Sequence, residues 1–162
     1  MVKQHDNGDR VISSNRRARR NYDVLDTYEA GIQLSGSEVK SLRDAKVQIA
    51  DGFARVDNKG EVWLHGVVIS PWAHSSRHTG HITDRRRKLL LHRAEIDKLR
   101  ARTEQEHLSL IPMSIYFKDG RAKVELALAR GRRDYDKRQV IAKRDADLEA
   151  RRALAHRSRR RD

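Results

Sequence analysis

Three separate segments of the sequence concentrate arginine and lysine. They are "NRRARR" at residues 15–20, "RRRK" at residues 85–88 and "GRRDYDKR" at residues 131–138. Their cationic side chains can neutralise phosphates, and the ring of Tyr135 offers a surface on which a base can stack. Clusters that converge on one face would form a footprint for folded RNA. For each cluster taken alone, a solvated or solubilising charge run is the alternative.

The overall composition also indicates an anionic partner. The 162 residues include 36 Lys and Arg against 23 Asp and Glu, which gives a net charge of +13 and a pI near 10.6. Such a balance favours a polyanion or an anionic membrane surface. No segment approaches the roughly 18 apolar residues of a membrane-spanning helix, and the N-terminus lacks an apolar signal core. Charge alone does not choose between these two partners. With no spanning or signal segment, we expect a cytoplasmic protein, and we favour the polyanion over a membrane as its partner.

Other chemistry is weakly represented in the sequence. Cysteine is absent, which excludes disulfides and thiolate metal sites. His74, His78 and His81 could be metal ligands, but no His-Glu-x-x-His motif or obvious fourth ligand accompanies them, so we expect no metal and no other cofactor. Phosphate contacts are the favoured use of these histidines, and a metal-dependent nuclease is a remaining alternative. Without a glycine-rich phosphate loop or a Gly-x-Ser-x-Gly elbow, the chain is predicted to be a binding protein, not an enzyme.

Two acidic residues among the basic ones need an interpretation. Glu38 follows Ser35 by three residues, which is typical of a helix capping box, so a structural role is expected for it. Glu29 occupies an outward position of a predicted strand. A role in surface recognition is therefore open to Glu29.

The elements that must position these residues are mainly strands. Apolar residues recur at even positions between residues 22 and 34, which predicts a long bent strand or a hairpin. Two further hairpins are predicted, with turns at residues 57–60 and at Asp119 and Gly120. Pro112 implies an edge strand or a bulge. Short helices are expected over residues 37–45 and 92–102, the second with Ile96 and Leu99 inward.

These elements predict one mainly β domain with small flanking helices. Because open strand edges are costly, the favoured architecture is an oligonucleotide-binding-like closed antiparallel β-barrel spanning residues 21–130. Residues 1–20 are predicted to be a flexible basic arm, because they show no apolar period.

Residues 131–162 form a basic tail in this scheme. They contain 12 Lys and Arg, 6 Asp and Glu, and few large aliphatic residues. We expect this flexible tail to be disordered in the free chain and helical once a polyanion supplies contacts. A solubilising, protease-sensitive end is the alternative.

Several motifs together resemble one family. They are "AGIQLSGSEVKSLRDAK" at residues 30–46, "RKLLL" at residues 87–91, and "IPMSIYFKDGRAKVELALARG" followed by "DKR" at residues 136–138. In order and spacing they resemble the SmpB family of SsrA-binding proteins, over roughly residues 13 to 155. The resemblance implies an oligonucleotide-binding-like barrel. It also implies binding to the tRNA-like domain of transfer-messenger RNA and delivery of that RNA to stalled bacterial ribosomes in trans-translation.

The resemblance also assigns residues and partners. Matching RNA-contact positions are Asn15, Glu29, Arg87, Lys88, Leu91 and Lys123, and the basic clusters add Arg16, Arg17, Arg19, Arg85 and Arg86. The tail motif comprises Gly131, Arg132, Arg133, Tyr135, Asp136, Lys137 and Arg138, which would enter the decoding centre and the empty mRNA channel of the ribosome. Elongation factor Tu and alanyl-tRNA synthetase would be partners indirectly, through the RNA. A general or ribosomal structural RNA-binding protein is the alternative function.

Overall fold

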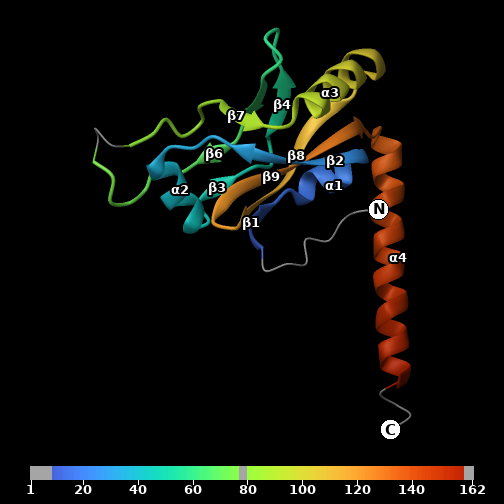
Figure 1. Cartoon of the computed structure of the whole chain (residues 1–162). Helices are drawn as coiled ribbons and strands as arrows, with labels where there is room; N and C mark the ends of the chain where they lie inside the picture. Colours follow the sequence, from blue (N-terminus) through green and yellow to red (C-terminus); the bar gives the residue numbers. More distant parts are fainter. Residues whose placement is uncertain (1–8, 77–79, 159–162) are drawn as a thin grey trace. The chain divides into compact units, whose positions relative to one another are not determined.

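The structure of the chain is a computed structural model that describes residues 9–76 and 80–158 (Figure 1). It divides into two compact units, Met1–Gly131 and Arg132–Asp162. We call the first the body and the second the tail, and we describe each by itself.

The described part of the body contains nine strands. They are β1 (Arg10–Ser14), β2 (Tyr22–Ile32), β3 (Val47–Gln48), β4 (Phe53–Val56), β5 (Val62–His65), β6 (Val68–Ile69), β7 (Arg87–Leu90), β8 (Ser109–Lys118) and β9 (Arg121–Gly131). Three helices accompany them, α1 (Arg16–Asn21), α2 (Gly36–Arg43) and α3 (Arg93–Glu106). The mainly β composition with small flanking helices confirms that part of the sequence prediction.

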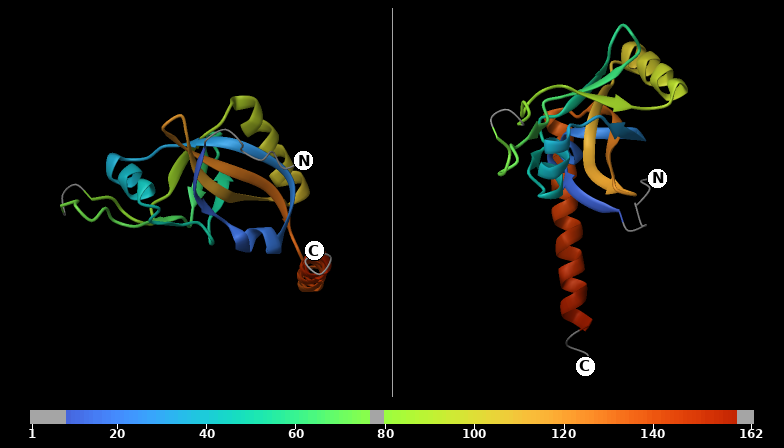
Figure 2. Two further views of the ribbon diagram at one scale, coloured as in Figure 1. Left: turned by 90° about the horizontal axis from the view of Figure 1, so that it is seen from below. Right: turned by 60° about the vertical axis from the view of Figure 1, so that its left-hand side comes forward.

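Seven strands form one antiparallel sheet that nearly closes on itself. Their order is β1-β8-β4-β5-β7-β2-β9, and β8 pairs with β9 as well. The β8–β9 ladder is long, whereas β4 meets β8 through the single pair Ala54 and Leu110. Figure 2 shows the strands of the body curving around a common interior. Strands β3 and β6 form a separate two-stranded sheet.

The predicted strand and hairpin positions are largely confirmed. Residues 22–32 form the single strand β2, and its register shifts between Val24 and Asp26, where the apolar alternation is interrupted. The turn between β8 and β9 places Asp119 and Gly120 at φ of 50° and 74°, which aspartate tolerates and which glycine adopts readily because it lacks a Cβ. A second register shift lies between Pro112 and Ser114, so the predicted bulge is present in β8.

The core lies inside the curved sheet. Alternating residues of β2, β5, β8 and β9 are buried there, including Ala30, Leu64, Ile115 and Leu126. Helix α3 adds Ile96 and Leu99, which confirms the predicted inward face, and α2 adds Leu42. A smaller cluster beneath α1 contains Ala18, Ile111, Met113, Ala127 and Ala129.

The N-terminal prediction needs correction. Residues 10–20 are not a flexible arm, because β1 pairs with β8 and α1 follows directly. Asn15 joins the two elements, and its Oδ1 accepts a hydrogen bond of 3.0 Å from the backbone of Ala18. The order therefore comes from pairing with a strand about 100 positions later in the chain, which local periodicity does not reveal.

The prediction of a disordered tail is also corrected. Residues Asp134–Ser158 form one continuous helix, α4. It contains neither Pro nor Gly, and His156 and Arg157 in its last turn complement the helix dipole. Ile141, Leu148 and Leu154 are exposed by 42%, 49% and 66%. Among the described side chains of α4 these three form no buried apolar face, so backbone hydrogen bonds and residue propensity are its main support.

Within the described residues, no helix combines the length and apolarity needed to cross a membrane.

Candidate nucleic-acid interface

Glu29 lies at the centre of a polar cluster on β2, β8 and β9. Its carboxylate accepts a hydrogen bond of 2.5 Å from the Tyr116 hydroxyl and contacts Lys118 Nζ at 3.3 Å. Lys123 lies on β9, directly opposite Gly31 of β2. Gly31 is two positions beyond Glu29 on the same strand. We call Glu29, Tyr116, Lys118 and Lys123 the Glu29 cluster.

The cluster keeps Glu29 ionised. The Tyr116 hydrogen bond lowers the pKa of Glu29 most strongly, and Lys118 and Lys123 lower it further against an opposing effect of burial. Burial and the bond to Glu29 raise the pKa of Tyr116, so its hydroxyl remains a donor. A carboxylate that Tyr116 and Lys118 hold in place can accept hydrogen bonds from base amino groups while Lys118 and Lys123 contact phosphates.

A shallow hollow of about 370 Å³ adjoins this cluster. Leu90 and Gly31 line it, together with Lys123 and Phe117. Leu90 is 54% exposed, whereas Leu91 packs partly buried against the core. The exposed leucine of the "RKLLL" segment is therefore Leu90, although the sequence prediction named Leu91.

One buried carboxylate, that of Glu38, fixes Arg85 and Arg87 at the start of β7. Both guanidinium groups contact Glu38 of α2, and the side chains of Glu38 and Arg87 are completely buried. Arg87 also donates to the carbonyl oxygens of Val67 at 2.8 Å and Thr83 at 2.9 Å. The predicted direct RNA contact of Arg87 is thus inconsistent with its position, because its donors are turned inward and used by protein atoms.

The neighbours of Arg87 face outward because side chains alternate along a strand. The Arg86 guanidinium lies 4.3 Å from the ring centre of Trp63. Lys88 Nζ pairs with Glu61 Oε1 at 2.8 Å, and both side chains are about one third exposed. Arg86 and Lys88 remain candidates for phosphate contacts.

The four predicted contact residues of the first basic cluster comprise one structural residue and three surface residues. Asn15 is buried, and its amide donates to the carbonyl oxygens of Pro112 at 3.0 Å and Ile49 at 3.3 Å. It therefore supports the body, and its predicted RNA contact does not fit this burial. Arg16, Arg17 and Arg19 are exposed on α1, and Arg17 pairs with Asp51 at 3.0 Å.

The third basic cluster lies at the junction of the two units. Gly131 ends β9 opposite Tyr22, and Arg132 and Arg133 precede α4. Tyr135 and Asp136 belong to the first turn of α4, and the Lys137 amide donates to the Arg133 carbonyl oxygen at 3.1 Å. Arg138 is exposed one residue later.

The histidine loop shows no metal site in its described part. His81 Nε2 donates to the Ile69 carbonyl oxygen at 2.9 Å, and Nδ1 lies 2.9 Å from the Ser37 hydroxyl. His74 packs against the edge of Trp72. His78 lies outside the described residues, and among those described no three His, Asp or Glu side chains could hold a metal ion together.

Comparison with known proteins identifies the family. The SmpB protein family profile matches residues 12–156. The SsrA-binding protein of Mycobacteroides abscessus is 54% identical over 158 residues, which cover 98% of each chain. That of Frankia casuarinae is 53% identical over 151 residues, covering 93% of this chain and 94% of the relative. The chain belongs to the SmpB family.

A solved structure described as "tmRNA-SmpB: a journey to the center of the bacterial ribosome" agrees with this assignment. It is 45% identical to this chain, with a TM-score of 0.64, and the match covers 81% of this chain and 94% of that one. The resemblance to SmpB that the sequence motifs indicated is therefore confirmed over nearly the whole chain.

The SmpB fold brings together some predicted site residues and separates others. Glu29 and Lys123 lie in one cluster, whereas Asn15 and Arg87 are interior residues. Sequence reasoning missed Tyr116, Lys118 and Leu90. The predicted Asp119–Gly120 turn sets Lys118 opposite Arg121 and Tyr116 opposite Lys123, so this part of the cluster was accessible from the sequence, whereas the contact between Glu29 and Tyr116 was not.

Proposed function

We propose that this chain binds the tRNA-like domain of transfer-messenger RNA, also called SsrA, and delivers it to stalled bacterial ribosomes for trans-translation. The observation that carries the proposal is identity of about 54% to SsrA-binding proteins over nearly the full chain. The structural relative from the tmRNA-SmpB system on the bacterial ribosome supports both RNA partners.

The SmpB family is an RNA-binding family without enzymatic activity. The Glu29 cluster and the outward Arg86 and Lys88 provide the body with the groups that such binding requires, because lysine and arginine neutralise phosphates and a carboxylate discriminates among bases. In the proposed division of labour, the body contacts the tRNA-like domain. Its near-closed sheet is the basis for proposing an oligonucleotide-binding-like barrel.

The tail acts on the ribosome in this proposal. It enters the decoding centre and the empty mRNA channel, where ribosomal RNA surrounds it with phosphates. Support comes from the exposed surface and basic composition of α4 and from the tail motif of residues 131–138. An exposed helix of this kind can gain its contacts from RNA instead of from the body.

Further partners follow from the RNA that is bound. Elongation factor Tu and alanyl-tRNA synthetase act on the aminoacyl end of a tRNA-like RNA, so they would meet this protein only through that RNA. The cytoplasm, where ribosomes translate, is the proposed location.

Capture of the protein with its RNA from cell extract, followed by sequencing, tests the proposal. We expect strong enrichment of transfer-messenger RNA, and binding in vitro that survives an excess of bulk tRNA. From a general or ribosomal RNA-binding protein, bulk tRNA would instead displace the labelled transfer-messenger RNA in proportion to the concentration of bulk tRNA. That result would contradict the proposal.

A further inference from the structure

The outer face of strands β4, β5 and β7 carries rings and cations in adjacent positions. Register pairs Phe53 with His65, Arg55 with Trp63, and Trp63 with Lys88. The alternate residues, such as Ala54, Val62 and Leu64, are buried in the core. Directly opposite residues share a face of the sheet, so the paired side chains point outward together. We call Phe53, Arg55, Trp63, His65 and Arg86 the ring–cation face.

The rings of this face are arranged for stacking. Phe53 and His65 are parallel within 12°, with ring centres 5.2 Å apart, and Arg55 lies 5.2 Å from the Phe53 ring centre. Arg86 lies 4.3 Å from the Trp63 ring centre, and Trp63 Nε1 donates to Asp57 Oδ2 at 3.0 Å. The indole is therefore fixed in orientation before any ligand arrives.

His65 contributes a neutral ring. Burial lowers its pKa, and the charges of Arg55 and Arg86 lower it further. The positive charge of the face thus resides on the two guanidinium groups, while Phe53 remains 37% exposed at the surface. Aromatic rings beside arginines are the combination that binds unpaired nucleotides, since bases stack on rings and phosphates pair with guanidinium groups.

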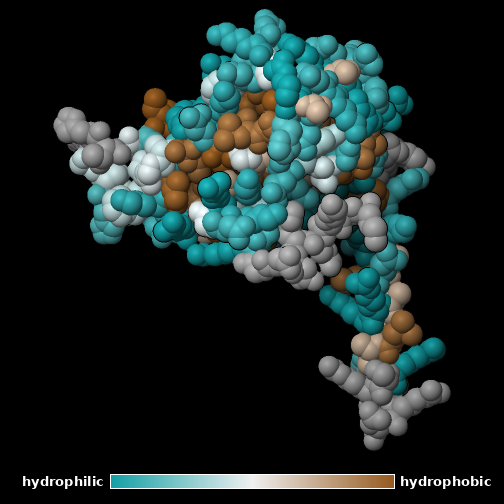
Figure 3. All heavy atoms as spheres, in the orientation of Figure 1, coloured by the Kyte–Doolittle hydropathy of each residue, from teal (hydrophilic) through white to brown (hydrophobic). Residues whose placement is uncertain are grey.

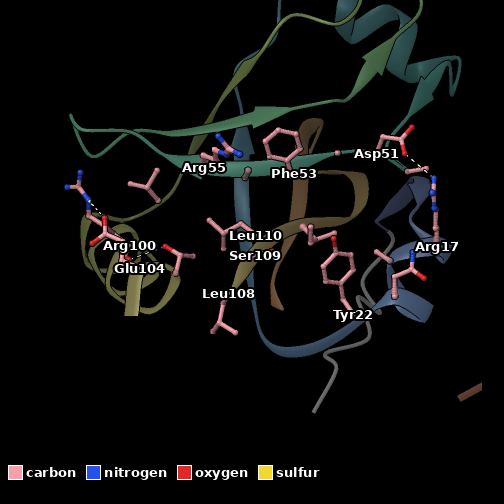
Figure 4. A pocket seen from close by; sticks show the side chains of 18 residues that line it. Arg17, Tyr22, Asp51, Phe53, Arg55, Arg100, Glu104, Leu108, Ser109 and Leu110 are labelled. Atoms are coloured by element: carbon pink, nitrogen blue, oxygen red, sulfur yellow. Dashed lines mark hydrogen bonds and ion pairs between the residues drawn. The ribbon is translucent and has the colours of Figure 1, made fainter. Parts of the chain in front are cut away.

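A hollow of about 660 Å³ adjoins Phe53 and Arg55 and provides space for a ligand. Figure 4 shows both side chains on one border of the hollow, with Tyr22 and Arg17 toward one end and Arg100 with Glu104 toward the other. Leu108 and Leu110 belong to its lining. Its volume falls within the range of small-molecule sites, which is enough for a nucleotide.

We propose that the ring–cation face binds an unpaired RNA nucleotide, with the base stacked on Phe53 and the flanking phosphate between Arg55 and Arg86. The occupant is RNA because a phosphate complements the two arginines and a base complements the exposed ring. This site has no residue in common with the Glu29 cluster, and Arg86 is the one residue it shares with the groups proposed above to contact the tRNA-like RNA. It extends the proposed function by a second RNA-contacting surface, and it does not depend on which structured RNA the body selects.

Binding of short RNA to the full chain tests the site. The probes are an unstructured oligoadenylate and the same ribose-phosphate backbone without bases. A Trp72→Phe background leaves Trp63 as the only tryptophan, so its fluorescence reports on the face. We expect oligoadenylate to change Trp63 fluorescence and to bind at least about tenfold more tightly than the abasic backbone, given what base stacking contributes.

Two substitutions of Phe53 separate the effect of its aromatic ring from the effect of its apolar volume. Phe53→Leu should weaken oligoadenylate binding about tenfold and leave abasic binding unchanged, whereas Phe53→Tyr should retain both. Equal binding of both probes, or wild-type affinity of Phe53→Leu, would overturn the proposal. If Phe53→Leu does not fold, Arg55→Gln serves instead, and unchanged oligoadenylate affinity in that variant would overturn it.

A parallel titration with tRNA-like RNA keeps this inference distinct from the proposed function. Loss of oligoadenylate binding with retained tRNA-like binding in Phe53→Leu supports the separate site. If the wild-type chain failed to bind tRNA-like RNA but bound oligoadenylate through Phe53, the proposed function would be wrong and the nucleotide site would stand.

Discussion

The Glu38 carboxylate and the Arg87 guanidinium form an ion pair in which neither side chain is exposed. This pair ties α2 to the start of β7, and Arg85 adds a hydrogen bond of 3.0 Å to the same carboxylate. The "RKLLL" segment therefore takes its position from a residue about 50 positions earlier. The outward side chains of Arg86 and Lys88, which we propose contact RNA, depend on this interior pair for their position.

Replacing Glu38 with Gln should destabilise the body strongly. Two arginines would lose their charge partner, and breaking a buried pair costs about 3 to 5 kcal/mol of the free energy of unfolding. Urea denaturation of the full chain measures this. Glu61→Gln is the matched control, because its pair with Lys88 is about one third exposed, and it should cost less than about 1 kcal/mol. Equal effects of the two substitutions would contradict the structural role of Glu38.

The contribution of Glu38 to stability should depend on pH. Burial tends to raise the pKa of Glu38, but hydrogen bonds from Arg85, the Ser35 amide and Arg87 outweigh it, and the pKa is lowered. The stabilisation is therefore complete above the pKa of an unfolded glutamate, about 4.3, and is lost as pH falls through the lower folded value. Unfolding measured from pH 7 to 3 should show the difference between wild type and Glu38→Gln shrinking below about pH 4. A difference that stays constant across this range would exclude the carboxylate as its source.

Glu29→Gln should reduce the selectivity of RNA binding. The substitution removes the negative charge that holds Lys118 and turns one of the two acceptor oxygens into an amino donor, so the preference for tRNA-like RNA over bulk tRNA should fall about tenfold, as for the loss of one specific contact. Glu106→Gln is a matched control, because the charge change is the same and Glu106 lies on α3, where it pairs with Arg102 at 3.1 Å. Competition binding distinguishes the two variants. Equal changes in selectivity would mean that only net charge matters.

RNA affinity should depend steeply on salt. If the body neutralises about five phosphates, affinity should fall by roughly two to three decades between 50 and 200 mM salt, from a slope of about 0.7 to 0.9 per contact. Lys123→Gln should reduce the slope by about one contact. Titrations at four salt concentrations measure both quantities. An affinity independent of salt would refute the basic footprint.

Much of the local structure was accessible from the sequence. The Asp119–Gly120 hairpin and the Ser35–Glu38 cap were predictable because the residues themselves favour those geometries, and the Ser35 amide does donate to Glu38 Oε1 at 3.0 Å. Strand β1 and helix α1 were not predictable in this way. Their sequences are polar, and their order depends on pairing with β8 and on the buried hydrogen bonds of Asn15.

The candidate site was predicted only in part for a similar reason. A run of four basic residues at 85–88 suggests that all four side chains face solvent. Figure 3 shows apolar areas between hydrophilic ones on the surface, and such a mixed surface does not indicate which cationic side chains turn inward. The strand period does carry that signal, since Arg87 and Leu89 share the inner face while Arg86 and Lys88 do not. The strand period cannot identify the ion-pair partner of Arg87, because Glu38 lies on α2, far away in the sequence.

Removing residues 132–162 tests the central claim most directly, namely that the body holds the tRNA-like RNA and the tail serves the ribosome. The truncated chain should bind the tRNA-like domain with an affinity within about twofold of wild type, less than the effect of one lost contact, while peptide tagging on stalled ribosomes is abolished. A truncated chain that is folded but no longer binds that RNA, or one that still supports tagging, would contradict the account.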